Sequence, residues 1–133
     1  MRRRNESRFF FAEDSELGYI DSLDFAVDGK SVRWAPDPGN PDIAFLVLNE
    51  PIPAGGQIRI RTPFHVKLPY CFSRLGHDGQ AYQLTQWYPK PAVYDKDGWH
   101  PLPYLDMGEF YSEFGSFDVR ITLPENYLVA ATG

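Results

Sequence analysis

Proline and glycine interrupt this chain so often that few stretches are long enough for a regular helix. The 133 residues include 12 prolines and 11 glycines, and chains rich in both are typical of short strands joined by turns. Aromatic residues make up 16% of the chain, which argues against disorder because disordered chains have few of them. No segment carries apolar residues at the 3.6-residue spacing of an amphipathic helix. The sequence therefore predicts an all-β protein.

The clearest local signal is a β-hairpin in 22-SLDFAVDGKSVRW-34. Leu23, Phe25 and Val27 occupy every second position, as on one face of a strand. Asp28 and Gly29 then supply the positive φ angles that a tight hairpin turn requires. We therefore expect two antiparallel strands joined at this Asp-Gly pair.

Other segments have the composition or the alternation of strands, at 7–12, 43–48, 57–68, 81–88, 116–123 and 127–132. The apolar run 43–48 is typical of a strand buried on both faces, and Pro63 predicts a bulge or an edge position. The other segments are predicted to be loops or turns, at 35–42, 73–80, 89–108 and 124–126. The whole chain, 1–133, is predicted to be one domain, an antiparallel β-sandwich or a saddle-like curved sheet of about eight strands.

Charge and hydropathy exclude two classes of partner. The formal net charge is −5 and the pI is about 5.1, which argues against a nucleic-acid-binding protein because such proteins carry basic surfaces. No stretch is apolar enough for a membrane span, and none resembles a signal peptide. The compartment stays open, and export to the periplasm or cell envelope is among the options. The single cysteine, Cys71, lies among apolar residues and is expected to be a buried structural thiol.

The sequence indicates neither a metal site nor a catalytic residue. His65, His77 and His100 belong to no metal-binding motif. The tetrapeptide 95-DKDG-98 places its glycine too early for a calcium loop, so we interpret it as a turn. No cofactor is therefore expected within these 133 residues.

The stretch 86-QWYPKPAVYDKDGWHPLPYLD-106 concentrates aromatic residues and prolines. Sugars and peptides both dock on exposed aromatic side chains, and Tyr and Trp are enriched at interfaces. Trp87, Trp99 and Tyr104 are therefore candidates for an interface. The same residues would serve equally well as a packed core, because a proline-rich loop loses little entropy when it becomes ordered.

Two pieces of the chain, 85-TQWYPKPAVYD-95 and 117-FDVRITLPENYLVAATG-133, carry a family resemblance. With the residues around them, from 72 to 133, they resemble the N-terminal β-domain of a bacterial branch of the membrane alanyl aminopeptidase family, the zinc gluzincins. Residues 7–71 fit the preceding strands of that domain in pattern only.

The resemblance implies a parent protein that is a zinc metallopeptidase and hydrolyses peptide bonds. In that family the zinc ligands lie in the next domain, in an H-E-x-x-H motif with a distal Glu, and the metal activates a water. None of these residues occurs in this chain. We therefore expect a non-catalytic domain that lines the active-site cleft, with the catalytic domain of the same chain as its partner. The chain also begins and stops close to predicted strands, so we expect it to be a fragment of a longer polypeptide.

The resemblance further implies a contact with the peptide substrate. In the family, a Gln or Glu on the strand before the proline-rich segment helps bind the free α-amine of the substrate, and Gln86 matches that position best. Tyr88 stands where many members carry a second Gln or Glu, so we assign both residues to substrate binding. The tyrosine is a departure that counts against strict aminopeptidase specificity.

Three alternatives remain open from the sequence. Gln86 could be an ordinary glutamine on a sheet face. The chain could be a self-sufficient carbohydrate- or peptide-binding β-sandwich that uses Trp87, Trp99 and Tyr104. It could also be a structural domain whose parent protein has lost its zinc motif.

Overall fold

The computed structural model describes residues 11–70, 74–105 and 110–131. Within these ranges the chain forms short strands and no helix, which confirms the all-β class. In chain order the strands are β1 (Tyr19–Asp21), β2 (Ala26–Val27), β3 (Lys30–Ser31), β4 (Arg33–Pro36), β5 (Ala44–Val47), β6 (Ile60–Arg61), β7 (His65–Lys67), β8 (Gly76–Asp78), β9 (Ala81–Gln83), β10 (Val93–Asp95) and β11 (Gly98–His100).

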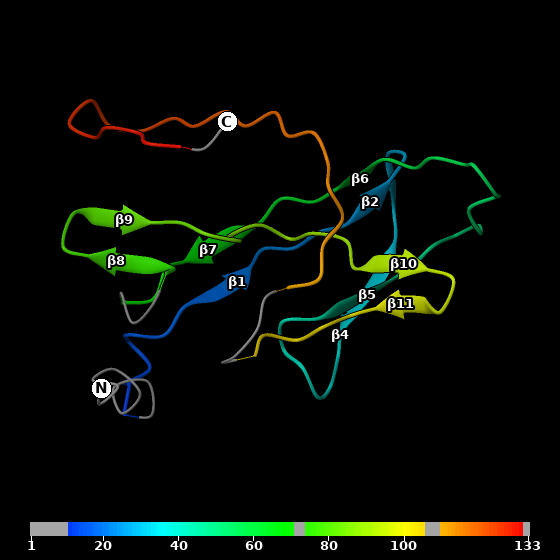
Figure 1. Cartoon of the computed structure of the whole chain (residues 1–133), viewed down its shortest axis with the longest axis horizontal. Helices are drawn as coiled ribbons and strands as arrows, with labels where there is room; N and C mark the ends of the chain where they lie inside the picture. Colours follow the sequence, from blue (N-terminus) through cyan, green and yellow to red (C-terminus); the bar gives the residue numbers. More distant parts are fainter. Residues whose placement is uncertain (1–10, 71–73, 106–109, 132–133) are drawn as a thin grey trace.

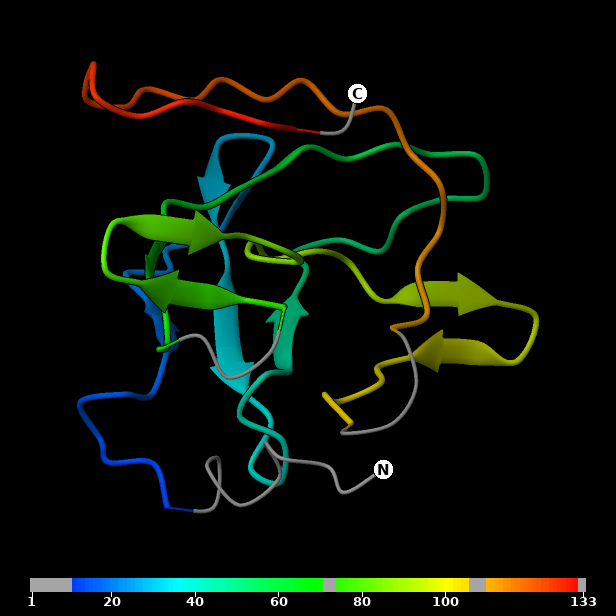
Figure 2. The ribbon, with the colours of Figure 1, turned by 60° about the vertical axis from the view of Figure 1, so that its left-hand side comes forward.

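These strands pair into several small antiparallel sheets rather than into one sandwich (Figures 1 and 2). One sheet has three strands in the order β3-β2-β6. The other sheets are the pairs β1-β7, β4-β5, β8-β9 and β10-β11. Because each strand has only two to four residues, each sheet offers little area on which a second layer could pack.

The predicted hairpin at the Asp-Gly pair is confirmed. β2 and β3 pair with Val27 opposite Lys30, and the turn residues Asp28 and Gly29 have φ angles of 48° and 81°. Asp28 also connects the turn to the next strand in the sheet, because its carboxylate accepts a hydrogen bond of 3.0 Å from the backbone N–H of Arg59. A local sequence signal therefore places both a turn and a neighbouring strand.

Pro63 lies at a break in pairing, as predicted. Before it, β6 pairs with β2, and after it, β7 pairs with β1. Between these two ladders, the four residues 22–25 oppose the three residues 62–64, which is the count of a β-bulge. Ser22 absorbs part of the distortion, with a φ of 59°.

The apolar run 43–48 does form a strand, but the prediction that it is buried on both faces is wrong. β5 pairs only with β4, and its side chains at Phe45 and Val47 are about half exposed. No second layer covers this two-stranded sheet among the described residues. An apolar run can therefore also form a strand whose side chains stay partly exposed.

Two hairpins lie wholly or partly where the sequence predicted loops, and β9 falls within the strand predicted for 81–88. β8 and β9 form one within 76–83, with the two residues Gly79 and Gln80 at the turn. β10 and β11 form the other within 93–100, where Lys96 and Asp97 connect the strands. The interpretation of 95–98 as a turn is confirmed, whereas the assignment of 73–80 and 89–108 as wholly irregular is wrong. β9 also ends at Gln83, so the strand predicted for 81–88 is too long.

The two predicted strands at 116–123 and 127–132 are not formed in the described residues, which extend to 131. The turn between them is present, because the backbone N–H of Tyr127 donates to the carbonyl of Pro124 at 3.0 Å. Both arms keep the apolar alternation but are largely exposed, with Leu128 at 99%. A strand requires a neighbour that completes its hydrogen bonds, and among the described residues these two arms form no ladder with each other or with another segment.

The apolar core of the described residues is small. Only Phe25, Val32 and Val93 are buried apolar side chains, with exposed fractions of 7%, 6% and 2%. The solvent-accessible area of the chain is 11969 Å², whereas a compact monomer of its mass exposes roughly 7,000 Å². The chain therefore exposes more surface than a compact monomer of its mass.

Some expectations fall outside the described residues. Cys71 does, as do residues 7–10 of the first predicted strand. The rest of that segment, Phe11 and Ala12, is not in a strand. In the part of the chain that is described, no helix is long and apolar enough to cross a membrane.

Candidate functional site

Gln86 lies on an exposed turn between β9 and β10 and not on a strand. Its φ of 52° is in the left-handed region, which strands do not use. β9 ends three residues before it. The strand position that the resemblance implies for Gln86 is therefore wrong, as is the alternative of an ordinary glutamine on a sheet face. Its side chain projects from a bent piece of backbone.

The side chain of Gln86 contacts an ammonium group that the chain itself supplies. The Nζ of Lys90 lies 3.3 Å from Gln86 Oε1 and also donates to the Oγ of Ser112. The same Nζ lies 4.7 Å from the centre of the Phe110 ring. We call Gln86, Lys90, Phe110 and Ser112 the ammonium cluster.

The chemistry of the ammonium cluster suits a primary amine. An amide oxygen and a hydroxyl oxygen accept hydrogen bonds, and an ammonium group has three to donate. A ring face attracts a cation at this distance. Gln86 and Lys90 are exposed, so a cation from solution can reach the same oxygen that now holds Lys90.

Trp87 and Tyr88, next to Gln86, are half-buried in an aromatic chain. The ring centre of Trp87 lies 5.9 Å from that of Phe64 and 5.7 Å from that of Tyr88. Tyr88 in turn lies 5.9 Å from Phe117. The structure therefore uses these two candidates to connect the turn to segments far away in sequence, and Tyr88 is not among the groups that contact the ammonium.

Trp99 and Tyr104 are more exposed than Trp87. Trp99 faces Tyr94 across the β10-β11 hairpin with ring centres 4.9 Å apart, and both side chains are 65% exposed. Tyr104 lies beside Phe110, at 5.8 Å, and so adjoins the ammonium cluster. Of the three interface candidates, Trp99 therefore belongs to a separate hairpin, whereas Tyr104 borders the cluster.

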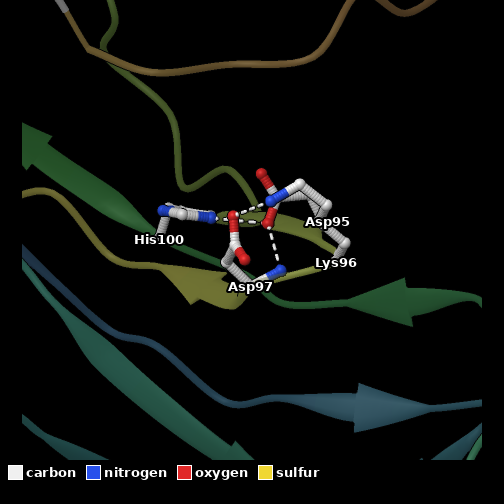
Figure 3. A network of polar contacts seen from close by, with 4 residues as sticks. All are labelled: Asp95, Lys96, Asp97 and His100. Atoms are coloured by element: carbon white, nitrogen blue, oxygen red, sulfur yellow. Dashed lines mark hydrogen bonds and ion pairs between the residues drawn. The ribbon is translucent and has the colours of Figure 1, made fainter.

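A polar network at the turn of that hairpin joins Asp95 to Asp97 and to His100, which reaches it from the end of β11 (Figure 3). His100 Nε2 lies 2.8 Å from Asp95 Oδ1, and the same oxygen accepts a 2.8 Å hydrogen bond from the backbone N–H of Asp97. The hydrogen bond from His100, followed by that from Asp97, lowers the pKa of the Asp95 carboxyl below its ordinary value of 3.8. His100 also packs edge-on against Tyr111 at 5.5 Å, so the network couples the hairpin to segment 110–112.

The lowered pKa predicts how the hairpin responds to acid. A carboxyl whose folded pKa is depressed stabilises the fold at pH values above its unfolded pKa, and that stabilisation is lost as the pH falls through the folded pKa. We therefore expect the backbone amide signals of β10 and β11, measured by nuclear magnetic resonance across a pH series, to change below pH 3.8. In His100→Gln the midpoint of Asp95 should move upward. Asp97→Asn is the matched control, because it keeps the backbone N–H that Asp95 binds. An unchanged midpoint in His100→Gln would contradict the assigned cause.

The sequence did not identify Lys90 and Ser112 as members of the site. Lys90 follows Gln86 by four residues, but the intervening bend, which brings them together, has no simple sequence signature. Ser112 lies 22 positions after Lys90 in the chain. The sequence does carry a signal for the Asp95–His100 pair. Asp95 begins the predicted turn at 95–98, and His100 follows that turn by two residues.

No group of three or more possible metal ligands gathers in the described ranges. A zinc ion therefore has no fitting donor set in the part of the chain that the structure describes. A scan against protein-family models found no matching family, and searches of curated proteins and of solved structures found no match.

Proposed function

We propose that this chain is the non-catalytic N-terminal domain of a zinc-dependent, aminopeptidase-like metallopeptidase, where it lines the active-site cleft and helps bind the N-terminus of the peptide substrate. The observation that carries the proposal is the contact between Gln86 Oε1 and an ammonium group at 3.3 Å. The resemblance of 85–95 and 117–133 to the gluzincin N-terminal domain assigns the same residue to the substrate amine.

Lys90 explains how the site would behave without substrate. Its ammonium occupies the acceptor that a substrate amine would use, and two ammonium groups at one oxygen repel each other. Lys90 is exposed and has a long flexible side chain, so it can swing into solvent when another amine arrives. The cluster is then an amine site that holds its own lysine as a substitute ligand.

The zinc chemistry belongs to the catalytic domain in this proposal. The bound metal would supply the activated water for attack on the peptide carbonyl. The described residues of this chain contribute no donor set for it. Their part is limited to binding and orienting the amine end of the peptide through Gln86, beside Tyr88 and Tyr104.

The exposed apolar surface supports a domain that works beside another. β5 presents the apolar side chains of Phe45 and Val47 to solvent. In a multidomain peptidase such surfaces are covered by the neighbouring domain. The catalytic domain of the same chain is therefore the partner that the proposal requires.

The test compares this chain with the longer polypeptide that the proposal requires. We expect the longer polypeptide to carry an H-E-x-x-H motif and to release N-terminal amino acids from peptides in a zinc-dependent manner. The 133-residue chain alone should release none. A longer polypeptide with intact zinc ligands and no activity on free N-termini would contradict the proposal. Degenerate zinc ligands would instead favour the purely structural role.

A second candidate function rests on the exposed Tyr94–Trp99 pair. Two adjacent aromatic rings, each 65% exposed on a hairpin, form the kind of platform on which sugars and peptides stack. This favours a carbohydrate- or peptide-binding module. Retention of the isolated chain on polysaccharide columns, lost in Trp99→Ala, would support that candidate, and no retention would discard its carbohydrate form.

A further inference from the structure

The segment 116–123 has the side-chain pattern of a strand but no strand partner. Phe117, Val119, Ile121 and Leu123 lie at alternate positions, and each is at least 45% exposed. The segment belongs to none of the sheets in the described residues. Figures 1 and 2 both show it running along the outside of the molecule, with 127–131 turning back beside it. The backbone edge of the segment that faces away from 127–131 is thus available to another strand.

The charged residues of this segment are placed symmetrically around its centre. Asp118 and Arg120 flank Val119, lie on the face opposite the apolar residues, and have side chains that are 86% and 93% exposed. Within one chain, Arg120 Nε lies 4.0 Å from Asp118 Oδ1. One negative and one positive charge at equal distances from a central residue form a self-complementary pattern.

We propose that two copies of this chain pair through antiparallel 116–123 segments, with a two-fold axis at Val119. In this register Asp118 of each copy lies opposite Arg120 of the other. Phe117 lies opposite Ile121, so the apolar face continues across both segments. Opposite charges and apolar residues in directly opposed positions are the pairs that stabilise antiparallel strands.

The neighbouring registers are unfavourable. Moving the axis to residue 118 places Asp118 opposite its own copy, and moving it to residue 120 does the same for Arg120. Parallel pairing in register also places like charges side by side. Among these arrangements, only the antiparallel one with its axis at Val119 places Asp118 opposite Arg120.

The pairing is compatible with the contacts inside each copy. Joining edges leaves the faces of the segment unchanged, so Phe117 keeps its ring contact with Tyr88 at 5.9 Å. Pro124 has no N–H and ends the ladder after 123. Because the same surface is used twice about a two-fold axis, the assembly closes as a dimer rather than growing into a fibre.

The test measures the mass of the 133-residue chain in solution across a concentration series by sedimentation. We expect a reversible dimer for the natural sequence. Asp118→Arg and Arg120→Asp alone should each weaken it by about tenfold, because each places like charges opposite each other twice. Both side chains are almost fully exposed, so the fold should be retained, which circular dichroism checks.

Two recombinations test the register. Mixing Asp118→Arg with Arg120→Asp should restore dimers between the two variants, and so should the double exchange in one chain. Four results would overturn the proposal: a monomer at all concentrations, single variants that dimerise like the natural sequence, no recovery in the mixture or in the double exchange, or species that keep growing beyond the dimer. A monomer would leave amine binding at Gln86 untouched, so the two proposals fail separately.

Discussion

Replacing Phe25 with alanine is expected to lower the free energy of unfolding by about 3–5 kcal/mol. Phe25 is one of only three buried apolar side chains among the described residues, and its ring packs against Trp34 with centres 5.5 Å apart. Domains of this size have a total stability of about 5–15 kcal/mol. The substitution should therefore remove a large fraction of the total stability of the chain. Urea unfolding followed by tryptophan fluorescence measures the change.

Phe114→Ala is the matched control for that prediction. The same side chain is removed, but Phe114 is fully exposed, at 105%. Substitutions at such positions change stability by less than about 0.5 kcal/mol. Equal losses in the two variants would show that Phe25 is not part of the core, whereas a large loss only for Phe25→Ala would support the packing described here.

Gln86→Ala is expected to weaken binding of a peptide with a free N-terminus by about tenfold, because a hydrogen bond to a charged group is lost at an exposed site. Lys90→Met should have the opposite effect and tighten binding several-fold, because it removes the ammonium that now occupies Gln86 Oε1. The opposite signs distinguish this site from a general loss of structure. Isothermal calorimetry or fluorescence titration of the 133-residue chain gives both values.

Lys96→Met is the control for charge. Lys96 is an exposed lysine of the same region, but its Nζ binds Asp97 and does not contact Gln86. It removes the same positive charge from the chain as Lys90→Met. If both lysine variants tighten binding equally, the effect is long-range electrostatics and the assignment of Lys90 as a substitute ligand is wrong.

The sequence predicted the fold best where a single residue type decides the local backbone. Asp28 and Gly29 favour positive φ angles, so the hairpin of β2 and β3 follows from them alone. Pro63 lacks an N–H, so a break in pairing there was also predictable. In both places the structure depends on the residue itself and needs no knowledge of distant neighbours.

Prediction failed where pairing and burial depend on distant partners. The arms 116–123 and 127–131 have the apolar pattern of strands, yet neither forms a hydrogen-bonded ladder with any of the described residues. Phe45 and Val47 look like core residues but remain half exposed because no second layer covers the β4-β5 sheet among the described residues. The apolar pattern of a segment shows which side chains could be buried. Whether they are buried depends on how the rest of the fold packs against them.

The candidate site was predictable only in part. The resemblance identified Gln86, but its place on a turn depends on a left-handed backbone that glutamine rarely adopts. Ser112 and Phe110 join it from a distant segment, and Lys90 joins it because the chain bends between them. The sequence also did not predict the hairpin within 89–108. The prolines there indicated an irregular loop, but the residues between them pair as β10 and β11.

The most direct test of an amine site at Gln86 is a comparison of two peptides that differ only at the N-terminus. The 133-residue chain, labelled with ¹⁵N, is titrated with a short peptide carrying a free α-amine and with its N-acetylated form. We predict saturable shifts of the Gln86 side-chain amide and of the Ser112 backbone amide with the free amine and none with the acetylated peptide. Equal shifts with both peptides, or no shift at Gln86 with either, would contradict a role of this chain in binding the substrate N-terminus.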